Sequence, residues 1–413
     1  MFSIPDLIKK AELGLADAFH GIEEIEMANT KRVLETFSKH QIAYRHFAPT
    51  TGYGYDDVGR DTLEKVFADL FATKAAIVRP HIASGTHALS MCLFGLALPG
   101  AHVLSVTGKP YDTLDDVLGI NEPVPGSLKE IGVSFSYVNL AKDGQIDLEA
   151  VENGIHDNTS VIMAQRSCGY AWRRSLAPED ISKLSAYLKE RHPNITLMVD
   201  NCYGEFVLDK EPSHYGADVC VGSLIKNPGG GLAPTGGYLV GTEQAIERIA
   251  SKLTAPGIGR EVGSYAGSYQ PFYQGLFMAP HTVAQAVKTA MLAAKVFELI
   301  GMKTTPASTA RRTDIIQAIE LGSPDRLIAF CQGIQMASPI DSMALPEPWD
   351  MPGYQNQVIM AAGTFISGAS IELSADAPMR EPYIAYLQGG LTYSHGKLAI
   401  ESALNRMQKA NCL

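Results

Sequence analysis

The chain has 413 residues, of which 46% are hydrophobic and 19% charged, a composition typical of a globular enzyme with two structural units. Its net charge of −10 disfavours nucleic-acid binding, which normally requires a basic face. Six cysteines without a CxxC pair and eleven histidines without an HExxH motif predict neither a disulfide scaffold nor a metal site. The sequence shows no signal peptide and no apolar run long enough to span a membrane, so we expect a cytoplasmic protein with no membrane partner.

The first 50 residues are charged and have helical spacing. Val33, Leu34 and Phe37 fall on one face of a predicted helix. We expect residues 1–50 to form arm helices that pack on another subunit or on the C-terminal unit.

Short apolar runs alternate with helical segments from Ala75 onward. The runs span 76–78, 103–106, 133–138, 160–164 and 195–199. Segments 63–71 and 178–190 carry apolar residues at helical spacing. Apolar strands separated by helices are typical of a mostly parallel sheet that is buried on both faces. We therefore predict an α/β large domain over residues 51–285.

A smaller α+β domain is predicted over residues 286–413. Before it, residues 256–280 carry eight Gly or Pro residues and five aromatic residues, which predicts a long structured loop. A helix from His281 to Leu299 is expected to follow. Further on, Val358–Ile366 and Ala369–Leu373 have the pattern of two antiparallel strands joined by a Ser-Gly hairpin turn.

Two ionisable residues of opposite charge lie at the ends of neighbouring apolar runs. Asp200 follows the run 195–199, and Lys226 follows a second short run at 218–222. An open α/β sheet binds its ligand at such strand ends. Pyridoxal phosphate (PLP) chemistry requires a lysine that forms a Schiff base and a carboxylate that keeps the pyridinium ring an electron sink. Taken alone, an aspartate at the end of a strand is often a helix or turn cap, and a lysine is often a solvated surface charge. Ser223 and three successive glycines beside Lys226 make the combination more specific for PLP chemistry.

The segment that contains both residues, VDN…SLIKNPGGG, resembles the cofactor core of fold-type-I PLP enzymes of the cysteine and methionine metabolism group. Further segments, RPHIASGTHAL, QRSCGYAWR, GSLIKNPGGGLAPTGGY and QGLFMAPH, resemble the aluminium-resistance branch, which is related to methionine γ-lyase and cystathionine β-lyase. The resemblance runs from about Tyr53 to Tyr393. It implies a transferase-like fold with a large, mostly parallel sheet domain and a smaller C-terminal domain, Lys226 as the Schiff-base lysine and Asp200 as the partner of the ring nitrogen.

Hydroxyl and glycine residues are candidates to bind the cofactor phosphate. Ser84, Gly85 and Thr86 precede an apolar helix, where free backbone N–H groups bind anions, although these residues would serve equally well as an ordinary helix cap. The resemblance adds Ser223 as a further hydroxyl. The family often has another hydroxyl directly before the lysine, where this chain has Ile225.

The resemblance also assigns tyrosines to the cofactor. Tyr111 stands where the family stacks an aromatic ring on the pyridine face. Tyr53 and Tyr55 lie in the segment that reaches the neighbouring subunit's phosphate in the family, which implies a homodimer or homotetramer with shared active sites. The family's phosphate arginine is missing from this segment, and Arg79 and Arg260 are candidates to replace it.

A substrate carboxylate calls for a bidentate arginine. Arg380 is our first candidate and Arg166 is the second. Either of them could instead pair with a structural carboxylate.

These features predict a PLP-dependent lyase that acts on an amino-acid substrate, with Lys226, Asp200 and Tyr111 as the catalytic residues. Lys226 would abstract the α-proton, and a β- or γ-leaving group would then be expelled; the resemblance implies a sulfur-containing substrate. Two alternatives stay open. Transamination or another amino-acid transformation would use the same residues, and a non-catalytic stress-related protein could retain the fold.

Overall fold

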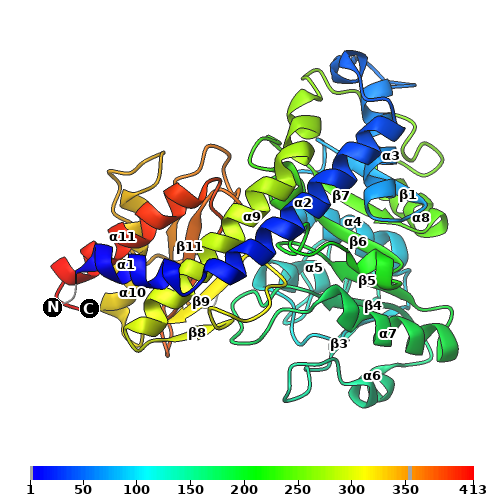
Figure 1. Cartoon of the computed structure of the whole chain (residues 1–413). Coiled ribbons are helices and arrows are strands. Elements are labelled where there is room, and N and C mark those ends of the chain that lie inside the picture. Colours follow the sequence, from blue (N-terminus) through cyan, green and yellow to red (C-terminus); the bar gives the residue numbers. More distant parts are fainter. Residues whose placement is uncertain (1–2, 352–355) are drawn as a thin grey trace.

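The computed structural model describes residues 3–351 and 356–413 and contains two β-sheets (Figure 1). The larger sheet has seven strands in the order β1-β7-β6-β5-β4-β2-β3. Its strands are β1 Ala75–Arg79, β2 His102–Ser105, β3 Ser134–Tyr137, β4 Thr159–Gln165, β5 Thr196–Asp200, β6 Val219–Ser223 and β7 Gly237–Gly241. β7 runs antiparallel to its neighbours β1 and β6, whereas β2 to β6 pair in parallel, so the predicted mostly parallel sheet is confirmed.

Helices cover both faces of the larger sheet, as its apolar strands predict. They are α3 Val58–Leu70, α4 Gly85–Leu96, α5 Asp115–Leu118, α6 Leu148–Gly154, α7 Pro178–Arg191 and α8 Glu243–Leu253. Consecutive residues of β5 belong to different cores, because side chains alternate along a strand. Met198 packs in the cluster that contains α4 and α8, and Val199 packs in the cluster that contains α3 and α7.

The smaller sheet is antiparallel and has the strand order β10-β11-β12-β9-β8. Its strands are β8 Lys303–Thr305, β9 Ile316–Glu320, β10 Val358–Ala361, β11 Ser374–Pro378 and β12 Ile384–Gln388. The helices α10 Pro324–Met336 and α11 Tyr393–Lys409 cover one face, where Ala375 and Leu387 join an apolar cluster with Leu327. The opposite face packs against residues of the larger unit.

The helix α9, Gln270–Leu299, crosses the molecule and runs beside both sheets (Figure 1). The prediction of a loop over residues 256–280 is therefore wrong over the part that α9 occupies. Pro271 lies in the first turn, where its missing N–H costs no helical hydrogen bond. Pro280 lies inside the helix, and the many buried side chains along α9 offset the hydrogen bond that this proline cannot donate. The helix also runs through residue 285, the predicted division between the two domains.

The predicted C-terminal hairpin is wrong in its boundaries. β10 and β11 do pair antiparallel, but residues 362–373 form the connection between them, including the predicted strand Ala369–Leu373. Within this connection Glu372 accepts the backbone N–H groups of Phe365 at 2.8 Å and Ile366 at 2.9 Å. A carboxylate therefore satisfies donors that a strand ladder would otherwise use.

The N-terminal segment forms two helices, α1 Ile4–Leu13 and α2 Ala16–Lys39. α1 packs on α9 and α11, and its Ile4 and Ile8 join the core of the smaller unit. α2 lies along α9 (Figure 1). Residues 1–50 were predicted to pack on another subunit or on the C-terminal unit, and α1 packs on the C-terminal unit. No helix in the described part of the chain combines the length and the apolar character needed to cross a membrane.

Candidate active site

The carboxyl ends of three parallel strands bring polar residues to one edge of the larger sheet. Gln165, Asp200 and Ser223 are the last residues of β4, β5 and β6. The N-terminus of α4 lies at the same edge, since a Cβ placed on Gly85 would be 3.5 Å from Cβ of Ser223 and 3.8 Å from Sγ of Cys202. This is the edge at which open α/β sheets bind ligands.

Lys226 follows β6 and reaches this edge. Its Nζ lies 4.1 Å from the centroid of the Tyr203 ring, within range of a cation–π contact. Lys226 and Tyr203 both keep partly accessible surface, so neither is sealed in the core. Tyr203 was not among the residues predicted from the sequence, although its place three residues after Asp200 could have identified it.

Glycines allow the loop after Lys226 to pack directly against α9. The 3-10 helix η4, Asn227–Gly229, is followed by Gly230 with φ of +55°, a conformation that favours glycine. A Cβ on Gly230 would clash with the carbonyl oxygen of Gly275 in α9, and a Cβ on Gly275 would clash with the carbonyl oxygen of Gly229. Contact between two backbones therefore fixes the position of the loop that carries Lys226.

Asp200 is 4% exposed at the end of β5. Its Oδ1 accepts the backbone N–H of Cys202 at 3.1 Å. Burial raises the pKa of Asp200, and the positive charge of Lys226 opposes that rise. The two residues that the sequence singled out therefore lie within electrostatic reach of each other.

Hydroxyl groups tie the loop that carries Tyr111 to the start of α4. Thr86 Oγ1 lies 3.0 Å from Tyr111 Oη and 3.1 Å from Thr113 Oγ1. The Tyr111 N–H donates to Gln165 Oε1 at 3.1 Å. Burial, helped by the negative charge of Asp200, raises the pKa of Tyr111 to about 12, so this phenol stays protonated at neutral pH.

The two serines predicted to bind phosphate differ in their surroundings. Ser84 is the N-cap of α4, and its Oγ accepts the N–H of His87 at 3.0 Å, which is the ordinary capping role that the sequence also allowed. Ser223 is 1% exposed, and its Oγ has no hydrogen-bond partner among the described residues.

An unpaired buried hydroxyl beside the free N–H groups of a helix start suits an anion such as a phosphate. A lysine amine lies at the same edge of the sheet, next to a buried carboxylate. The residues present therefore fit PLP. From here on, the Lys226 site means the following set: Thr86, Tyr111, Asp200, Tyr203, Ser223 and Lys226.

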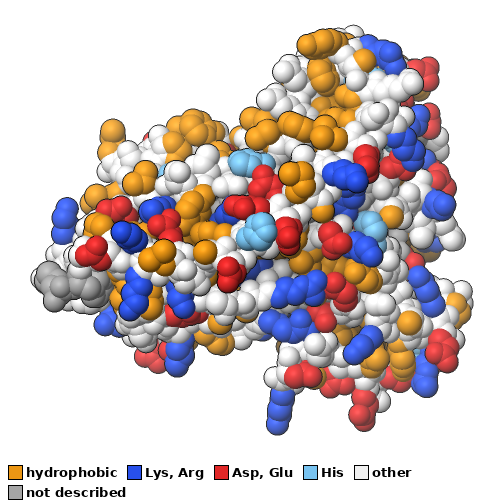
Figure 2. Space-filling model, in the orientation of Figure 1, with side chains coloured by type: hydrophobic (Ala, Val, Ile, Leu, Met, Phe, Trp, Pro, Cys, Tyr) orange, Lys and Arg blue, Asp and Glu red, His pale blue; other side chains and the backbone are white. Residues whose placement is uncertain are grey.

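Tyr53 and Tyr55 lie on the surface and outside the Lys226 site of their own chain. Their side chains are 72% and 64% exposed, and their ring centroids are 5.6 Å apart. The backbone around them is fixed, because Gly263 N–H donates to the Tyr53 carbonyl at 2.9 Å and Ser264 Oγ donates to the Gly52 carbonyl at 2.8 Å. Figure 2 shows apolar side chains gathered at the end of the molecule where α2 ends.

Arg166 is buried, and its guanidinium is used inside the chain. Its nitrogens donate to the Leu176 carbonyl, Asn201 Oδ1 and the Thr313 carbonyl. It also lies 3.6 Å from the Glu211 carboxylate. These contacts argue against Arg166 as the ligand of the substrate carboxylate and fit the structural role that the sequence left open.

The two arginines expected to replace the missing phosphate arginine are already paired. Arg79 is fully buried, and its Nε donates to Glu64 at 2.6 Å. Arg260 lies 2.9 Å from Glu243 and 3.1 Å from Glu247. These ion pairs argue against either arginine as the phosphate cation.

Arg380 lies on the exposed rim of the smaller sheet. Its guanidinium donates to the Tyr170 carbonyl at 3.5 Å. Together with Trp172 and Tyr386 it lines a pocket of about 290 Å³. Tyr386 belongs to the apolar cluster on which Tyr203 packs, so this pocket adjoins the Lys226 site.

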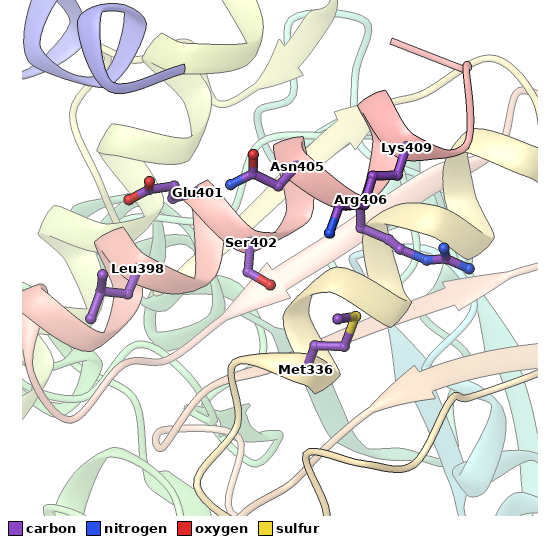
Figure 3. Close-up of a pocket in the computed structure, with 7 residues that line it drawn as sticks. All are labelled: Met336, Leu398, Glu401, Ser402, Asn405, Arg406 and Lys409. Atoms are coloured by element: carbon purple, nitrogen blue, oxygen red, sulfur yellow. The ribbon is translucent and has the colours of Figure 1, made fainter. Parts of the chain in front are cut away.

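A larger pocket of about 510 Å³ lies between α10 and α11 (Figure 3). Its lining includes Met336, Ser402 and Arg406. These two helices cover the face of the smaller sheet opposite to the one that meets Tyr203. The pocket is therefore separate from the Lys226 site, and none of the predicted site residues lines it.

Comparison with known proteins agrees with this arrangement. The sequence profile of the methionine gamma-lyase family matches residues 4–408. The protein YnbB of Bacillus subtilis is 52% identical over 409 residues, which cover 98% of this chain and 97% of that protein.

Solved structures extend the comparison to the fold. A carbon-sulfur lyase involved in aluminum resistance from Clostridium novyi has a TM-score of 0.94 at 49% identity, with 98% of this chain and 96% of that chain covered. The PLP-dependent protein YhfS of Escherichia coli shares the fold, with a TM-score of 0.63 at 16% identity over 94% of this chain and 97% of that chain. The resemblance to the aluminium-resistance branch of fold-type-I enzymes is confirmed. The chain therefore belongs to the methionine gamma-lyase family of PLP-dependent enzymes.

Proposed function

We propose that this enzyme is a lyase that acts on a sulfur-containing amino acid by α-proton abstraction followed by β- or γ-elimination. The observation that carries the proposal is the position of Lys226, whose Nζ lies over the Tyr203 ring. Asp200 and Ser223 end neighbouring strands at the same edge of the sheet. Membership of the methionine gamma-lyase family makes elimination at a carbon–sulfur bond the reaction that this arrangement serves best.

The residues that would hold PLP come from α4, β5, β6 and the loop that carries Tyr111. Gly85 and Thr86 would bind the phosphate through the first N–H groups of α4, and Ser223 would add its unpaired hydroxyl. Tyr111 would offer a flat ring, and Asp200 would place a negative charge beside the ring nitrogen. When bound, PLP supplies an electron sink for the negative charge that develops at the substrate α-carbon.

Lys226 is the proposed base. Its amine, once freed from the cofactor, accepts the α-proton of the substrate. The Tyr203 ring holds the resulting ammonium in place through the cation–π contact at 4.1 Å. The pKa of Tyr111, raised to about 12 by burial and by Asp200, keeps its phenol neutral, so it does not compete with Lys226 for the proton.

Arg380 is the proposed ligand of the substrate carboxylate. It is exposed on the rim of the 290 Å³ pocket that adjoins the Lys226 site. The one hydrogen bond that its guanidinium makes within the described residues, to the Tyr170 carbonyl, is long at 3.5 Å. The guanidinium thus keeps donors for a bidentate contact with a carboxylate.

We also propose that two chains share their active sites in a homodimer or homotetramer. Tyr53 and Tyr55 are exposed aromatic residues whose rings lie together, with centroids 5.6 Å apart. Exposed apolar patches of this kind are typical of protein–protein contacts. Isologous pairing would bring Tyr53 or Tyr55 of one chain to the phosphate site of its partner.

The direct test incubates the purified holoenzyme with methionine, cysteine and their thioether derivatives and measures 2-oxo acids, ammonia and thiols. Release of pyruvate with a thiol identifies β-elimination, and release of 2-oxobutyrate with a thiol identifies γ-elimination. A 2-oxo acid formed without thiol or ammonia would identify a transaminase instead. No product from any substrate would contradict the proposal.

A further inference from the structure

The smaller sheet presents polar side chains on the face opposite to its own helices. Ala375, Ala377 and Leu387 point into the core beneath α10 and α11. Because side chains alternate along a strand, Asp376 in β11 and Gln388 in β12 lie on the other face. Ser374 shares this face and pairs with Gln388 across the ladder.

This polar face meets the Lys226 site. Ile384 and Tyr386 of β12 lie on the same face as Gln388 and belong to the cluster on which Tyr203 packs. The chain just after β12 also touches the lysine loop, because a Cβ placed on Gly231 would collide with the Leu391 side chain. The polar residues of β11 and β12 therefore border the Lys226 site from the side opposite to the larger sheet.

Asp376, Gln388 and Ser374 form an incompletely paired group, which we call the polar triad. Asp376 accepts a hydrogen bond from Gln388 Nε2 at 2.8 Å and keeps partly accessible surface. Ser374 is 4% exposed, and its Oγ lacks a hydrogen-bond partner anywhere in residues 3–351 and 356–413. A buried unpaired hydroxyl beside a carboxylate indicates a place for a ligand group.

In the part of the chain that the structure describes, Asp376 forms no ion pair, and its hydrogen-bond partner is the neutral side chain of Gln388. Burial raises the pKa of Asp376 to about 7, while the hydrogen bond from Gln388 and the charge of Lys226 lower it. In the proposed function Lys226 is joined to the cofactor before the substrate binds and afterwards serves as the base for the α-proton, so its charge is not reserved for Asp376. A carboxylate in such surroundings is stabilised by a cation that arrives from outside.

We propose that the polar triad is a subsite for a second ammonium group carried by the substrate, on the far side of its sulfur atom. An ammonium has three donors and no acceptor. The Asp376 carboxylate, the Gln388 side-chain carbonyl and the Ser374 hydroxyl can accept one hydrogen bond each. This inference rests on the proposed lyase function and narrows it to amino acids with a cationic substituent on sulfur.

The binding test uses two amino acids that cannot be eliminated. L-Lysine carries the second ammonium, and L-2-aminoheptanoate is its neutral counterpart of the same length. Calorimetry on the PLP-loaded enzyme should show that lysine binds roughly ten- to a hundredfold more tightly. Asp376→Asn should remove that preference, whereas Glu190→Gln, which removes an exposed charge on α7, should keep it.

The turnover test uses S-(2-aminoethyl)-L-cysteine, which carries a terminal ammonium, and S-propyl-L-cysteine, which carries a methyl group in its place. The wild type should favour the aminoethyl compound in kcat/KM, and Asp376→Asn should bring the ratio close to one. Equal binding of lysine and its neutral counterpart by the wild type would overturn the subsite. An equal loss for both members of a pair in Asp376→Asn would also overturn it, since that pattern indicates a structural role. Failure of the lyase function itself would appear separately, as no product from either thioether, while calorimetry still reports on the subsite.

Discussion

Each of the two sheets holds a carboxyl group within electrostatic reach of Lys226, but by different means. Asp200 ends a strand and is bound by the backbone N–H of Cys202, whereas Asp376 lies within a strand and is bound by the side-chain amide of Gln388. A backbone contact persists when neighbouring side chains change, and a side-chain contact does not. The larger sheet is therefore suited to a task that is the same for every substrate, and the smaller sheet is suited to selecting among substrates.

Each side of the site also carries a buried serine hydroxyl without a partner in the part of the chain that the structure describes. Ser223 belongs to the larger sheet and Ser374 to the smaller sheet. Such hydroxyl groups are exceptions in folded proteins. In the proposals above, Ser223 binds the cofactor phosphate and Ser374 binds a substrate ammonium.

The largest expected effect is on the larger-sheet side, at Lys226. Lys226→Ala should lower turnover by about 10³-fold or more, because both the covalent link and the base are lost. Borohydride reduction followed by peptide mapping should place pyridoxyl on Lys226 in the wild type and on no peptide in the variant. Lys303→Ala, which removes an exposed lysine paired with Glu320, is the control. A reducible link that survives in Lys226→Ala would refute the assignment.

Asp200→Asn tests whether Asp200 and Asp376 have different tasks. We expect turnover to fall roughly 10²-fold, the size of a lost electrostatic contribution, while PLP stays bound. The loss should be equal for the aminoethyl and propyl thioethers, whereas Asp376→Asn should change their ratio. Steady-state kinetics with both compounds gives the answer. A changed ratio in Asp200→Asn would break the proposed division between the two sheets.

The two serines provide the next comparison. Ser223→Ala should weaken PLP binding by roughly tenfold, because a hydrogen bond to a charged phosphate is lost. Ser374→Ala should leave PLP affinity unaltered, since it lies on the substrate side. Titration of the apoenzymes, followed by the visible absorbance of bound cofactor, measures both affinities. Equal weakening in the two variants would show that Ser374 also contributes to the phosphate site.

The smallest expected effect concerns the part of the site that Tyr53 and Tyr55 of a partner chain would supply. Lys226→Ala and the double variant Tyr53→Phe/Tyr55→Phe are mixed in equal amounts and allowed to exchange subunits, at a PLP concentration at which neither parent is active. A shared site restores one intact pocket in each mixed dimer, so random exchange should return about a quarter of the wild-type activity. No recovery despite demonstrated exchange would mean that each chain builds its site alone.

The sequence was informative where function depends on neighbours along the chain. Asp200, Ser223 and Lys226 stand at strand ends within short motifs, so the apolar runs alone place them at one edge of a sheet. Ser84 and Thr86 were placed at a helix start by the same reasoning, because helix starts have a local signature; Ser84 is the N-cap of α4, and the role of Thr86 at the phosphate stays a prediction.

The residues that the sequence did not reveal depend on contacts between distant segments. Asp376 and Gln388 come together only through the register of β11 and β12. The structural role of Arg166 depends on Thr313, far along the chain. The helix over Gln270–Leu299 was missed over its first part because glycine and proline lower helix propensity, and packing against other elements outweighs that preference.

The close glycine contact between η4 and α9 limits how far the Lys226 amine can be displaced. The smallest possible side chain at Gly275 would push against the carbonyl oxygen of Gly229 and lift the whole turn. Since catalytic groups must be held within about 0.5 Å of their working position, one added methyl group on a distant helix could misplace the lysine without touching it. The position of α9 therefore determines the position of Lys226. A damaging substitution in α9 would have the effect of an active-site substitution, although every active-site residue is intact.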